Sequence, residues 1–187
     1  MLQQTQVSRV VVKYGEFLEQ FPTLEHVARA KPARVMEAWE GLGYYARARN
    51  LHRLAREVTS GSGTSAARLP SEPEVLRELP GIGAYTAGAV ASFAYERRAA
   101  LVDTNVARVL KRVFAPKVQI KTTKGQRMVW GIAEAILPRT GRATWMHNQA
   151  LMELGALICT ARIARCDQCP VRSYCATGSK PSGRRAT

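Results

Sequence analysis

Four cysteines near the C-terminus constrain this chain more than any other feature. Cys159, Cys166, Cys169 and Cys175 lie within seventeen positions, in the spacing C-x6-C-x2-C-x5-C. Even numbers of cysteines are typical of disulfide frameworks in exported proteins, but the chain does not open with a basic segment followed by an apolar run. We therefore interpret the tight group as a set of metal ligands.

The spacing also distinguishes between kinds of metal centre. Structural zinc sites usually combine two C-x2-C pairs, and this loop contains one, formed by Cys166 and Cys169. A [4Fe–4S] cluster needs four cysteine thiolates and no histidine, and the loop supplies such a set. The sequence thus favours an iron–sulfur cluster over zinc, and either metal centre over free structural thiols.

The charge balance predicts a polyanionic partner. Lys and Arg number 28 against 14 acidic residues, which gives a net charge of +14 and a pI near 10.3. Such a surplus is self-repelling unless a polyanion relieves it, and phosphate neutralisation releases counterions. We therefore expect nucleic acid as the partner. The longest apolar stretch, about residues 87–95, is too short to span a membrane. We expect a cytoplasmic, nucleoid-associated monomer without membrane contact.

Apolar residues recur at three- and four-residue steps along most of the chain, which predicts helices. Thr23 is expected to cap one helix, Pro32 to open another, and Asp103 or Thr104 to cap a third. The expected helices cover residues 7–21, 24–30, 45–58, 72–78, 84–95, 124–137 and 144–159. Two more are expected to begin at residues 32 and 104.

Little of the sequence indicates any other structure. Alternating strand patterns are nearly absent, and Val118 to Ile120 is at best a short extended piece. The Gly/Ser-rich stretch 60–65 is expected to be a flexible surface loop, and the basic end of the chain to be disordered. The sequence therefore predicts an all-α fold.

A glycine-containing turn separates two of the expected helices, in the stretch Leu79-Pro80-Gly81-Ile82-Gly83. Two glycines two positions apart permit a tight turn with outward-pointing N–H groups, and the next helix begins at once. Exposed amides and the positive end of a helix dipole together favour phosphate. Most such turns are only turns, but the net charge favours DNA contact at Gly81 and Gly83. Such contacts position the backbone and carry no sequence information.

A second candidate DNA contact is the stretch 41–50, with the sequence GLGYYARARN. Aromatic side chains can wedge into a base stack, while Arg47 and Arg49 can hold phosphates. On composition alone, an equally good interpretation is that Tyr44 and Tyr45 are boundary residues at the start of a helix.

Taken together, these segments resemble the adenine DNA glycosylases, the A/G-mismatch branch of the endonuclease III superfamily. The resemblance extends over residues 1 to about 177. The cysteine spacing and the hairpin are shared across the superfamily, whereas LQQTQ and GYYARAR point to the adenine branch. The matching stretches are residues 2–7, 41–50, 79–89, 102–106 and the four-cysteine loop.

The resemblance implies a two-lobed helix-hairpin-helix glycosylase fold with a [4Fe–4S] cluster loop. Residues 1–98 would form a six-helix domain, 99–177 the cluster domain, and 178–187 a disordered basic tail. The partner would be double-stranded DNA with a mismatched adenine, opposite guanine or 8-oxoguanine. That adenine would be flipped into a cleft between the lobes.

The resemblance also implies roles for three residues in base removal. Asp103 matches the carboxylate that stabilises an oxocarbenium-like state, although an aspartate at this position is more often an N-cap. Asn105 would orient the sugar or the acid. Tyr85 lies where bifunctional relatives carry a Schiff-base lysine, so we expect base removal without efficient strand cleavage.

Three further residues would contact the opened duplex. Tyr44 matches the residue that wedges beside the mismatched purine. Gln3 and Gln4 match residues that fill or probe the opened stack, although exposed glutamines are usually just solvated.

The resemblance places the general-acid glutamate two positions before Met1, and it places a C-terminal 8-oxoguanine-reading domain after the present end. We therefore expect impaired catalysis. Thr104 stands where many members have glycine. Two alternatives stay open: a thymine or uracil mismatch glycosylase, and a catalytically inert DNA-binding fragment. A ferredoxin-like electron carrier fits poorly with the charge and the hairpin.

Overall fold

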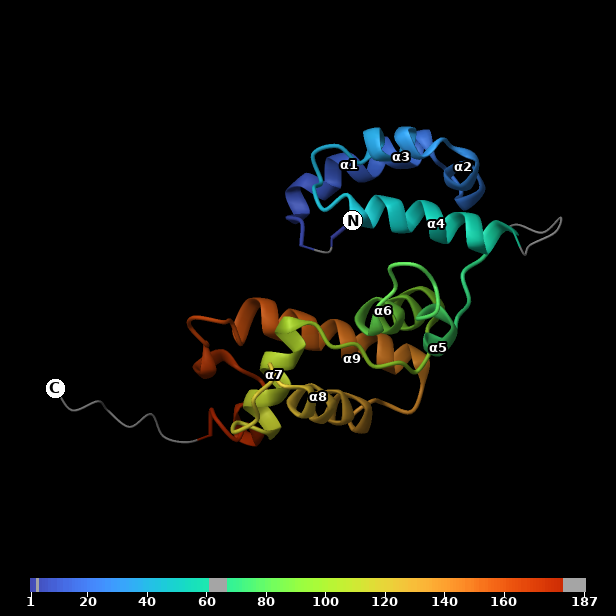
Figure 1. The fold of residues 1–187 in the computed structure, drawn as a ribbon. Helices are drawn as coiled ribbons and strands as arrows, with labels where there is room; N and C mark the ends of the chain where they lie inside the picture. The colour runs from blue at the N-terminus through green and yellow to red at the C-terminus, as the bar shows by residue number, and fades with distance from the viewer. Residues whose placement is uncertain (3, 61–66, 180–187) are drawn as a thin grey trace. The chain divides into compact units, whose positions relative to one another are not determined.

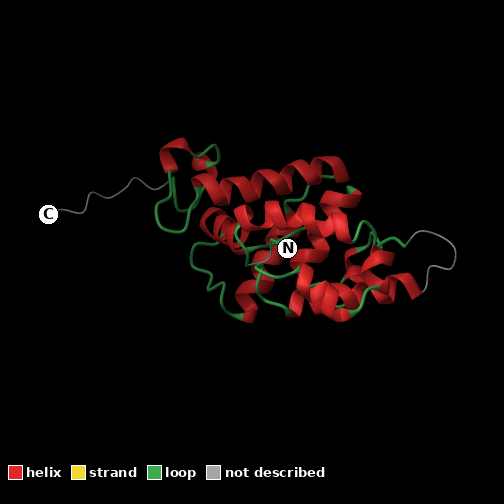
Figure 2. Cartoon of the chain, turned by 90° about the horizontal axis from the view of Figure 1, so that it is seen from above, coloured by secondary structure: helices red, strands yellow, loops and turns green. Residues whose placement is uncertain are grey.

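The computed structural model describes residues 1–2, 4–60 and 67–179. Over these residues the chain consists of helices joined by loops and contains no β-strand (Figure 2). The expected all-α class is thereby confirmed. The predicted loop at 60–65 and tail at 178–187 lie almost wholly outside the described residues.

The helices follow the predicted order along the chain (Figure 1). None of the described helices combines the length and the apolar character that a membrane crossing requires. Their bounds are α1 Val7–Gln20, α2 Leu24–Arg29, α3 Pro32–Ala38, α4 Ala46–Ser60, α5 Pro73–Leu76, α6 Ala84–Tyr95, α7 Thr104–Phe114, α8 Thr123–Ala135 and α9 Gly141–Glu153.

The caps at the starts of two helices differ from the expectation. Thr23 occupies the N-cap position of α2 but makes no capping bond, because its hydroxyl lies 2.9 Å from Nδ1 of His26. The last long helix begins at Gly141 rather than Thr144, since the Thr140 hydroxyl caps it by accepting from the Ala143 N–H at 3.3 Å.

The end of that helix also differs from the prediction. After α9 the chain continues as a π-helical turn, Leu154–Ile158, in which the N–H of Cys159 donates to the Leu154 carbonyl at 2.7 Å. Single π-helical turns are rare and are frequently found at functional sites. Periodicity over so few residues cannot distinguish this turn from ordinary α-helix.

The chain divides into two compact units, each with its own core. Unit 1 comprises Met1–Pro70 and Glu74–Ile82, and unit 2 comprises Ser71–Pro73 and Gly83–Thr187. The boundary between the two units therefore falls inside the glycine hairpin, between Ile82 and Gly83. The assignment of functional domains to residues 1–98 and 99–177 stays a prediction.

Unit 1 is organised around aromatic side chains. Phe17 packs against Phe21 with ring centroids 5.0 Å apart, and it meets Trp39 edge-on at 6.0 Å. On α3, Val35 faces this core and is 1% exposed. Helix α4 closes the unit, and its buried His52 Nε2 lies 3.0 Å from the Ala30 carbonyl oxygen.

Unit 2 is built around α7. Its core contains Leu101, Val106, Leu110, Val129 and Ala133. The four buried positions of α7 recur at three- and four-residue steps, as the sequence predicts. This helix carries the residues of the candidate site on its other faces.

A buried amide fixes the extended segment that leads into α7. Asn148 is 2% exposed, and its Nδ2 donates to the Ala99 carbonyl and to Oγ of Ser92, both at 2.9 Å. Gly88 allows this segment to lie against α6, since a Cβ there would be 1.9 Å from the Ala100 carbonyl oxygen. The path of the chain to Asp103 is therefore set by packing within unit 2.

Candidate active site and cluster loop

Asp103 begins α7 as its N-cap residue, as the sequence predicts. Its Oδ1 accepts a hydrogen bond from the Val106 N–H at 2.7 Å, which satisfies one of the amides that a helix start leaves free. The side chain is partly buried. A carboxylate at this position lies at the positive end of the helix dipole.

The second carboxylate oxygen is held by Asn105. Asn105 Nδ2 donates to Oδ2 of Asp103 at 3.1 Å, and its own Oδ1 accepts from Nη2 of Arg108 at 2.8 Å. The structure therefore brings Asp103 and Asn105 together as the sequence predicts. It adds Arg108 as a third member of the group.

Arg108 connects this carboxylate to the region of the cysteines. Its Nη2 donates to the Gly155 carbonyl of the π-helical turn at 2.7 Å, and its Nε donates to the Cys159 carbonyl at 2.8 Å. A continuous chain of hydrogen bonds thus runs from Asp103 to the first cysteine. Networks of this kind orient the groups at their ends.

Tyr85 lies on α6 and packs, half-buried, against the core of unit 2. Burial raises the pKa of the Tyr85 hydroxyl, and the negative charge of Asp103 raises it further. The phenol is therefore neutral at physiological pH. Unlike an amine, it cannot form an imine with a sugar aldehyde.

The two glycines of the hairpin differ in backbone conformation and in the space around them. Gly81 has φ +79°, and a Cβ there would lie 2.7 Å from Cβ of Asn50. The turn is closed by the Ile82 N–H, which donates to the Leu79 carbonyl at 3.1 Å. Gly83 is the N-cap residue of α6, and a Cβ there would meet nothing within 4 Å. The open approach at Gly83 is suited to a phosphate.

The aromatic loop before α4 has an unusual backbone. Gly41 and Gly43 have positive φ, and so does Tyr44, with φ 48°. A non-glycine residue in this region is uncommon and costs free energy. The Tyr44 side chain is nevertheless 61% exposed, so no burial in the structure offsets that cost. Tyr44 lies just before α4, where its carbonyl accepts from the Arg47 N–H at 2.9 Å, so it is a boundary residue at a helix start. Its DNA contact stays a prediction.

Arg47 holds that loop in place. Its Nη1 donates to the Met1 carbonyl at 2.6 Å, and its Nη2 donates to the Thr5 hydroxyl at 2.8 Å and to the Leu42 carbonyl at 3.0 Å. The guanidinium also lies 5.5 Å from the Tyr44 ring centroid. Arg47 therefore ties three segments of unit 1 together, and its predicted phosphate contact stays a prediction.

The other predicted DNA contacts of unit 1 lie around or beside this loop. Gln4 has φ 58° and, with Tyr44, lines a surface hollow of about 490 Å³. Gln3 lies outside the described residues. Arg49 is exposed on α4, as a phosphate contact requires. Their DNA contacts stay predictions.

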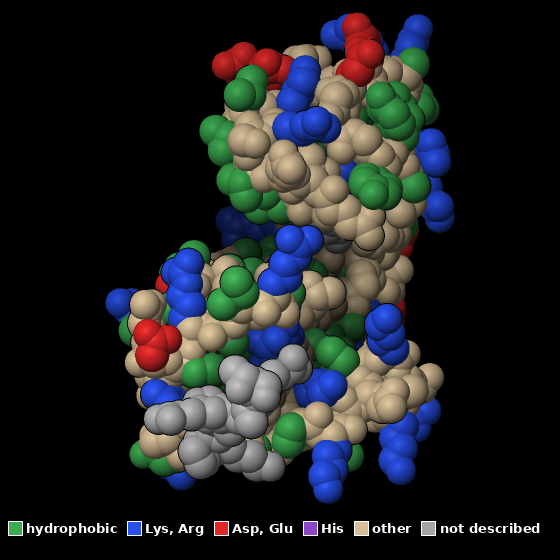
Figure 3. Space-filling model, turned by 90° about the vertical axis from the view of Figure 1, so that its left-hand side faces the viewer, with side chains coloured by type: hydrophobic (Ala, Val, Ile, Leu, Met, Phe, Trp, Pro, Cys, Tyr) green, Lys and Arg blue, Asp and Glu red, His purple; other side chains and the backbone are tan. Residues whose placement is uncertain are grey.

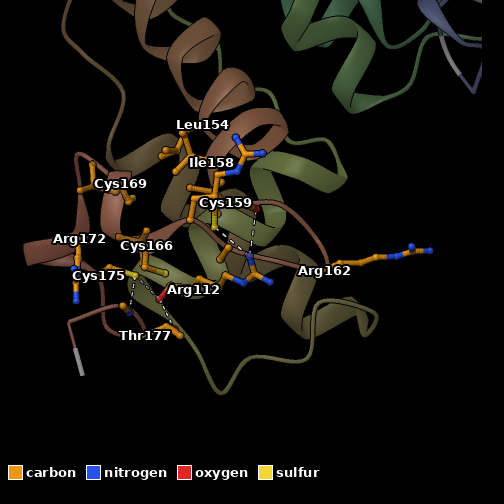
Figure 4. Close-up of a pocket in the computed structure, with 16 residues that line it drawn as sticks. Arg112, Leu154, Ile158, Cys159, Arg162, Cys166, Cys169, Arg172, Cys175 and Thr177 are labelled. Carbon is orange, nitrogen blue, oxygen red and sulfur yellow. Dashed lines mark hydrogen bonds between the residues drawn. The ribbon is translucent and has the colours of Figure 1, made fainter. Parts of the chain in front are cut away.

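The four cysteines line a single cavity of about 250 Å³ (Figure 4). None of them forms a disulfide, and Cys175 is the most buried. Within the described residues, no group of three or more Cys, His, Asp or Glu side chains converges closely enough for a single metal ion. A cubane cluster binds one thiolate at each iron, so its ligands surround a volume rather than a point. The cavity fits that arrangement.

Basic side chains dominate the surface near this loop. Figure 3 shows many Lys and Arg side chains, and few acidic ones, on the lower part of the face that it presents. The loop itself contributes Arg162, Arg165 and Arg172 to the rim of the cavity. This distribution is the electrostatic pattern that a polyanion requires.

A protein-family match covers most of the chain. Residues 1–134 match the HhH-GPD superfamily of base excision DNA repair proteins. The chain belongs to this family. The match includes the hairpin, Tyr85, Asp103 and α7, so the HhH-GPD assignment covers the candidate site.

Adenine DNA glycosylases are among the relatives of this HhH-GPD protein. The human enzyme is 43% identical over 94% of this chain and 31% of its own length. The enzyme of Mycolicibacterium smegmatis is 44% identical over 94% of this chain and 57% of its own length. The chain therefore spans from about a third to just over half of these relatives.

Solved structures of DNA glycosylases have the same fold as this chain. A thermostable thymine-DNA glycosylase superposes with a TM-score of 0.83 at 28% identity, covering 96% of this chain and 81% of that one. A trapped endonuclease III–DNA covalent intermediate superposes with a TM-score of 0.78 at 23% identity, covering 95% and 80%. The predicted helix-hairpin-helix glycosylase fold is thereby confirmed.

Sequence reasoning missed the two arginines of α7 that face the four-cysteine loop. Arg108 and Arg112 are separated by one helical turn, and Asn105 lies one turn before Arg108. That spacing predicts a shared face for the three side chains. The sequence does not indicate that the π-helical turn and Cys159 would lie opposite them.

Proposed function

We propose that this HhH-GPD protein is a monofunctional adenine DNA glycosylase, which removes adenine mispaired with guanine or 8-oxoguanine. One observation carries the proposal: the chain is 43–44% identical to adenine DNA glycosylases over 94% of its length, and Asp103 lies within that span. The substrate is double-stranded DNA, recognised by the basic surface and the hairpin. The protein acts as a monomer.

Asp103 performs the electrostatic part of the reaction. As the bond between adenine and deoxyribose breaks, positive charge develops on the sugar, and a fixed carboxylate lowers the energy of that state. Both carboxylate oxygens are already oriented, one by the Val106 N–H and one by Asn105. Little reorganisation is needed when the charge appears.

Tyr85 determines the outcome after base loss. A neutral phenol does not attack the sugar aldehyde, so the product is an abasic site rather than a cleaved strand. Its pKa, raised by burial and by Asp103, keeps the hydroxyl protonated beside the carboxylate.

Tyr44, Gln3 and Gln4 open the base stack in this proposal. The strained and exposed Tyr44 is the wedge, since an aromatic ring can replace stacking lost when a base is flipped. The amides of Gly81 and Gly83, together with Arg47 and Arg49, hold the phosphate backbone.

The proposed cofactor is a [4Fe–4S] cluster held by Cys159, Cys166, Cys169 and Cys175, whose side chains surround one cavity. When bound, the cluster would brace the loop and supply a one-electron redox couple. The basic rim of the loop then faces the DNA backbone. The cluster itself would take no part in base removal.

The decisive experiment is a single-turnover excision assay with duplexes that contain A opposite 8-oxoguanine or A opposite G. It is performed with the 187-residue chain and with a version lengthened by its upstream codons, because the resemblance places the general-acid glutamate there. Adenine release by either version, lost in Asp103→Asn, supports the proposal. Absence of adenine release from both versions contradicts it.

A second candidate is removal of thymine from a G·T mismatch. It is favoured by the superposition on a thymine-DNA glycosylase with a TM-score of 0.83. The same assay with G·T and G·U duplexes separates the two functions. Release of thymine or uracil with adenine left in place would assign the second one. A chain that binds duplex and releases no base would be an inert DNA-binding fragment.

A further inference from the structure

Arg112, near the C-terminal end of α7, contacts the first end of the four-cysteine loop through its guanidinium. Nη1 donates to Sγ of Cys159 at 3.3 Å, to the Cys159 carbonyl at 3.2 Å and to the Thr160 carbonyl at 2.8 Å. Nη2 lies 3.4 Å from the Ala161 carbonyl. Figure 4 shows the side chain directed toward Cys159 from below the cavity.

The backbone of Arg112 holds the other end of the same loop. Its carbonyl accepts from the Thr177 hydroxyl at 2.8 Å and from the Thr177 N–H at 3.2 Å. The next carbonyl, of Val113, accepts from the Ala176 N–H at 2.9 Å. Arg112 therefore contacts the first ligand and the two residues that follow it, and also the chain immediately after the last ligand.

We propose that Arg112 closes the four-cysteine loop at both ends, and that its guanidinium is the donor that stabilises the Cys159 thiolate in the cluster-bound state. This inference rests on the cofactor named in the proposed function. It assigns Arg112 a positioning role toward the cofactor, separate from that of Arg108, which contacts the Cys159 carbonyl and continues to Asn105.

The physical reason is the charge of the ligands. Four thiolates bring negative charge into a partly enclosed cavity, and buried charge is unfavourable unless hydrogen bonds compensate it. Hydrogen bonds to cluster sulfurs also raise the reduction potential, because they stabilise the more negative reduced state. Arg112 supplies both a positive charge and an N–H at Cys159.

The opposite end of the loop has a matching donor. The Gly178 N–H donates to Sγ of Cys175 at 3.2 Å. A Cβ at Gly178 would make only ordinary van der Waals contacts, 3.5 Å from that sulfur and 3.7 Å from Sγ of Cys166. The first and last ligands thus each receive an N–H, one from a side chain and one from the backbone.

Arg162 provides a matched control. It carries the same charge, lies in the same loop and is exposed. Figure 4 shows its side chain extending away from the cavity, whereas Arg112 points toward it. Neutralising Arg162 therefore changes the net charge equally without removing a donor to sulfur.

The experiment compares the full chain, purified with its iron, with Arg112→Gln, Arg112→Lys and Arg162→Gln. The readouts are iron per chain, visible absorbance, the rate of iron loss to a chelator and the one-electron midpoint potential. We expect Arg112→Gln to lose iron roughly 10–100-fold faster than wild type and to shift the potential in the negative direction. Arg112→Lys is expected to be intermediate, since it keeps the charge but not the fork of donors.

Unchanged iron loss and potential in Arg112→Gln would overturn the inference, as would an equal effect of Arg162→Gln. If Arg112→Gln does not fold, Thr177→Val tests the contact at the C-terminal end of the loop by itself. That variant removes the hydroxyl contact to the Arg112 carbonyl and is expected to lose iron faster at an unchanged potential. Iron loss at the wild-type rate would contradict it. The iron content of the wild-type chain tests the cofactor separately, and no readout depends on base excision.

Discussion

Asn105 donates a hydrogen bond to Asp103 across the first turn of α7, with Nδ2 and Oδ2 3.1 Å apart. The same carboxylate accepts the Val106 N–H through its other oxygen. One side chain thus caps a helix and presents an oriented negative charge. The capping and catalytic interpretations of Asp103 are compatible, because they use different oxygens.

Replacing Asp103 separates its two roles. Asn is as good an N-cap as Asp, so Asp103→Asn is expected to lose less than about 1 kcal/mol of folding free energy. Its single-turnover rate of adenine release is expected to fall roughly 10²–10³-fold, because the charge is lost. Asp103→Ala should lose both activity and about 1–2 kcal/mol of stability. Denaturant melts and excision assays measure the two effects, and equal instability of both variants would contradict this division.

Gly155 is expected to control the position of Asn105. A Cβ at Gly155 would lie 2.8 Å from Cβ of Asn105, closer than real contacts permit. Gly155→Ala is therefore expected to cost about 1–3 kcal/mol and to slow adenine release. Gly131→Ala is the control, because a Cβ there meets nothing within 4 Å. It should stabilise α8 by about 0.5–1 kcal/mol at an unchanged excision rate. A Gly155→Ala protein as stable and active as wild type would contradict the prediction.

The two hairpin glycines are expected to respond differently to alanine. Gly81→Ala combines a positive φ with a close contact to Asn50, so a loss of about 1–3 kcal/mol in unfolding free energy is expected. Gly83→Ala is sterically open and should leave stability within about 1 kcal/mol of wild type. It should weaken duplex binding by obstructing the approach of a phosphate. Binding titrations at fixed salt test this, and wild-type affinity in Gly83→Ala would remove Gly83 from the interface.

Tyr85→Lys is expected to introduce strand cleavage. The amine would stand beside Asp103 and could condense with the sugar aldehyde of an abasic site, with release of water, to form an imine. The partial burial that raises the pKa of Tyr85 would lower that of a lysine and keep part of it unprotonated. Borohydride trapping of a protein–DNA adduct, absent in wild type and in Tyr85→Phe, measures the outcome. Trapping in Tyr85→Phe would show that another amine is responsible.

His147 is expected to make the fold sensitive to mild acid. Burial lowers the pKa of His147 from its ordinary value of 6.5, and its buried Nε2 has no hydrogen-bond partner among the described residues. The unfolded chain therefore binds this proton more readily than the folded one. The stability is fully present above about pH 6.5 and decreases as the pH falls below it. His147→Leu should reduce this decrease in urea melts between pH 7 and pH 5, and an unaltered slope would exclude His147 as its cause.

The sequence predicted the helices well wherever an apolar face repeats over several turns. Helix α6 has the predicted bounds, α1 ends one residue before the predicted end, and α4 differs from prediction by one or two residues at each end. The predicted caps were wrong where one polar side chain can bond to more than one nearby group. Thr23 bonds to a ring nitrogen instead of capping, and Thr144 is buried within α9 instead of starting it.

Two features of the site depended on distant parts of the chain. The positive φ of Tyr44 follows from a loop held by Arg47, whose partners include the carbonyl of Met1. The π-helical turn places the Gly155 carbonyl against Arg108, 47 positions away. No local pattern specifies such partners, because side-chain hydrogen bonds over long separations depend on how helices pack.

By itself the sequence determined the all-α class, the group of four cysteines, the hairpin and the N-cap aspartate. These depend on periodicity, spacing and residue chemistry, which are local. Only the tertiary structure decided that Asn105 and Arg108 join Asp103 to the first cysteine, and that Arg112 holds the loop at both ends. Those contacts exist because α7 lies against the loop, and packing of that kind results from burying the α7 core face. The polar partners on its other faces then follow from where that packing places them.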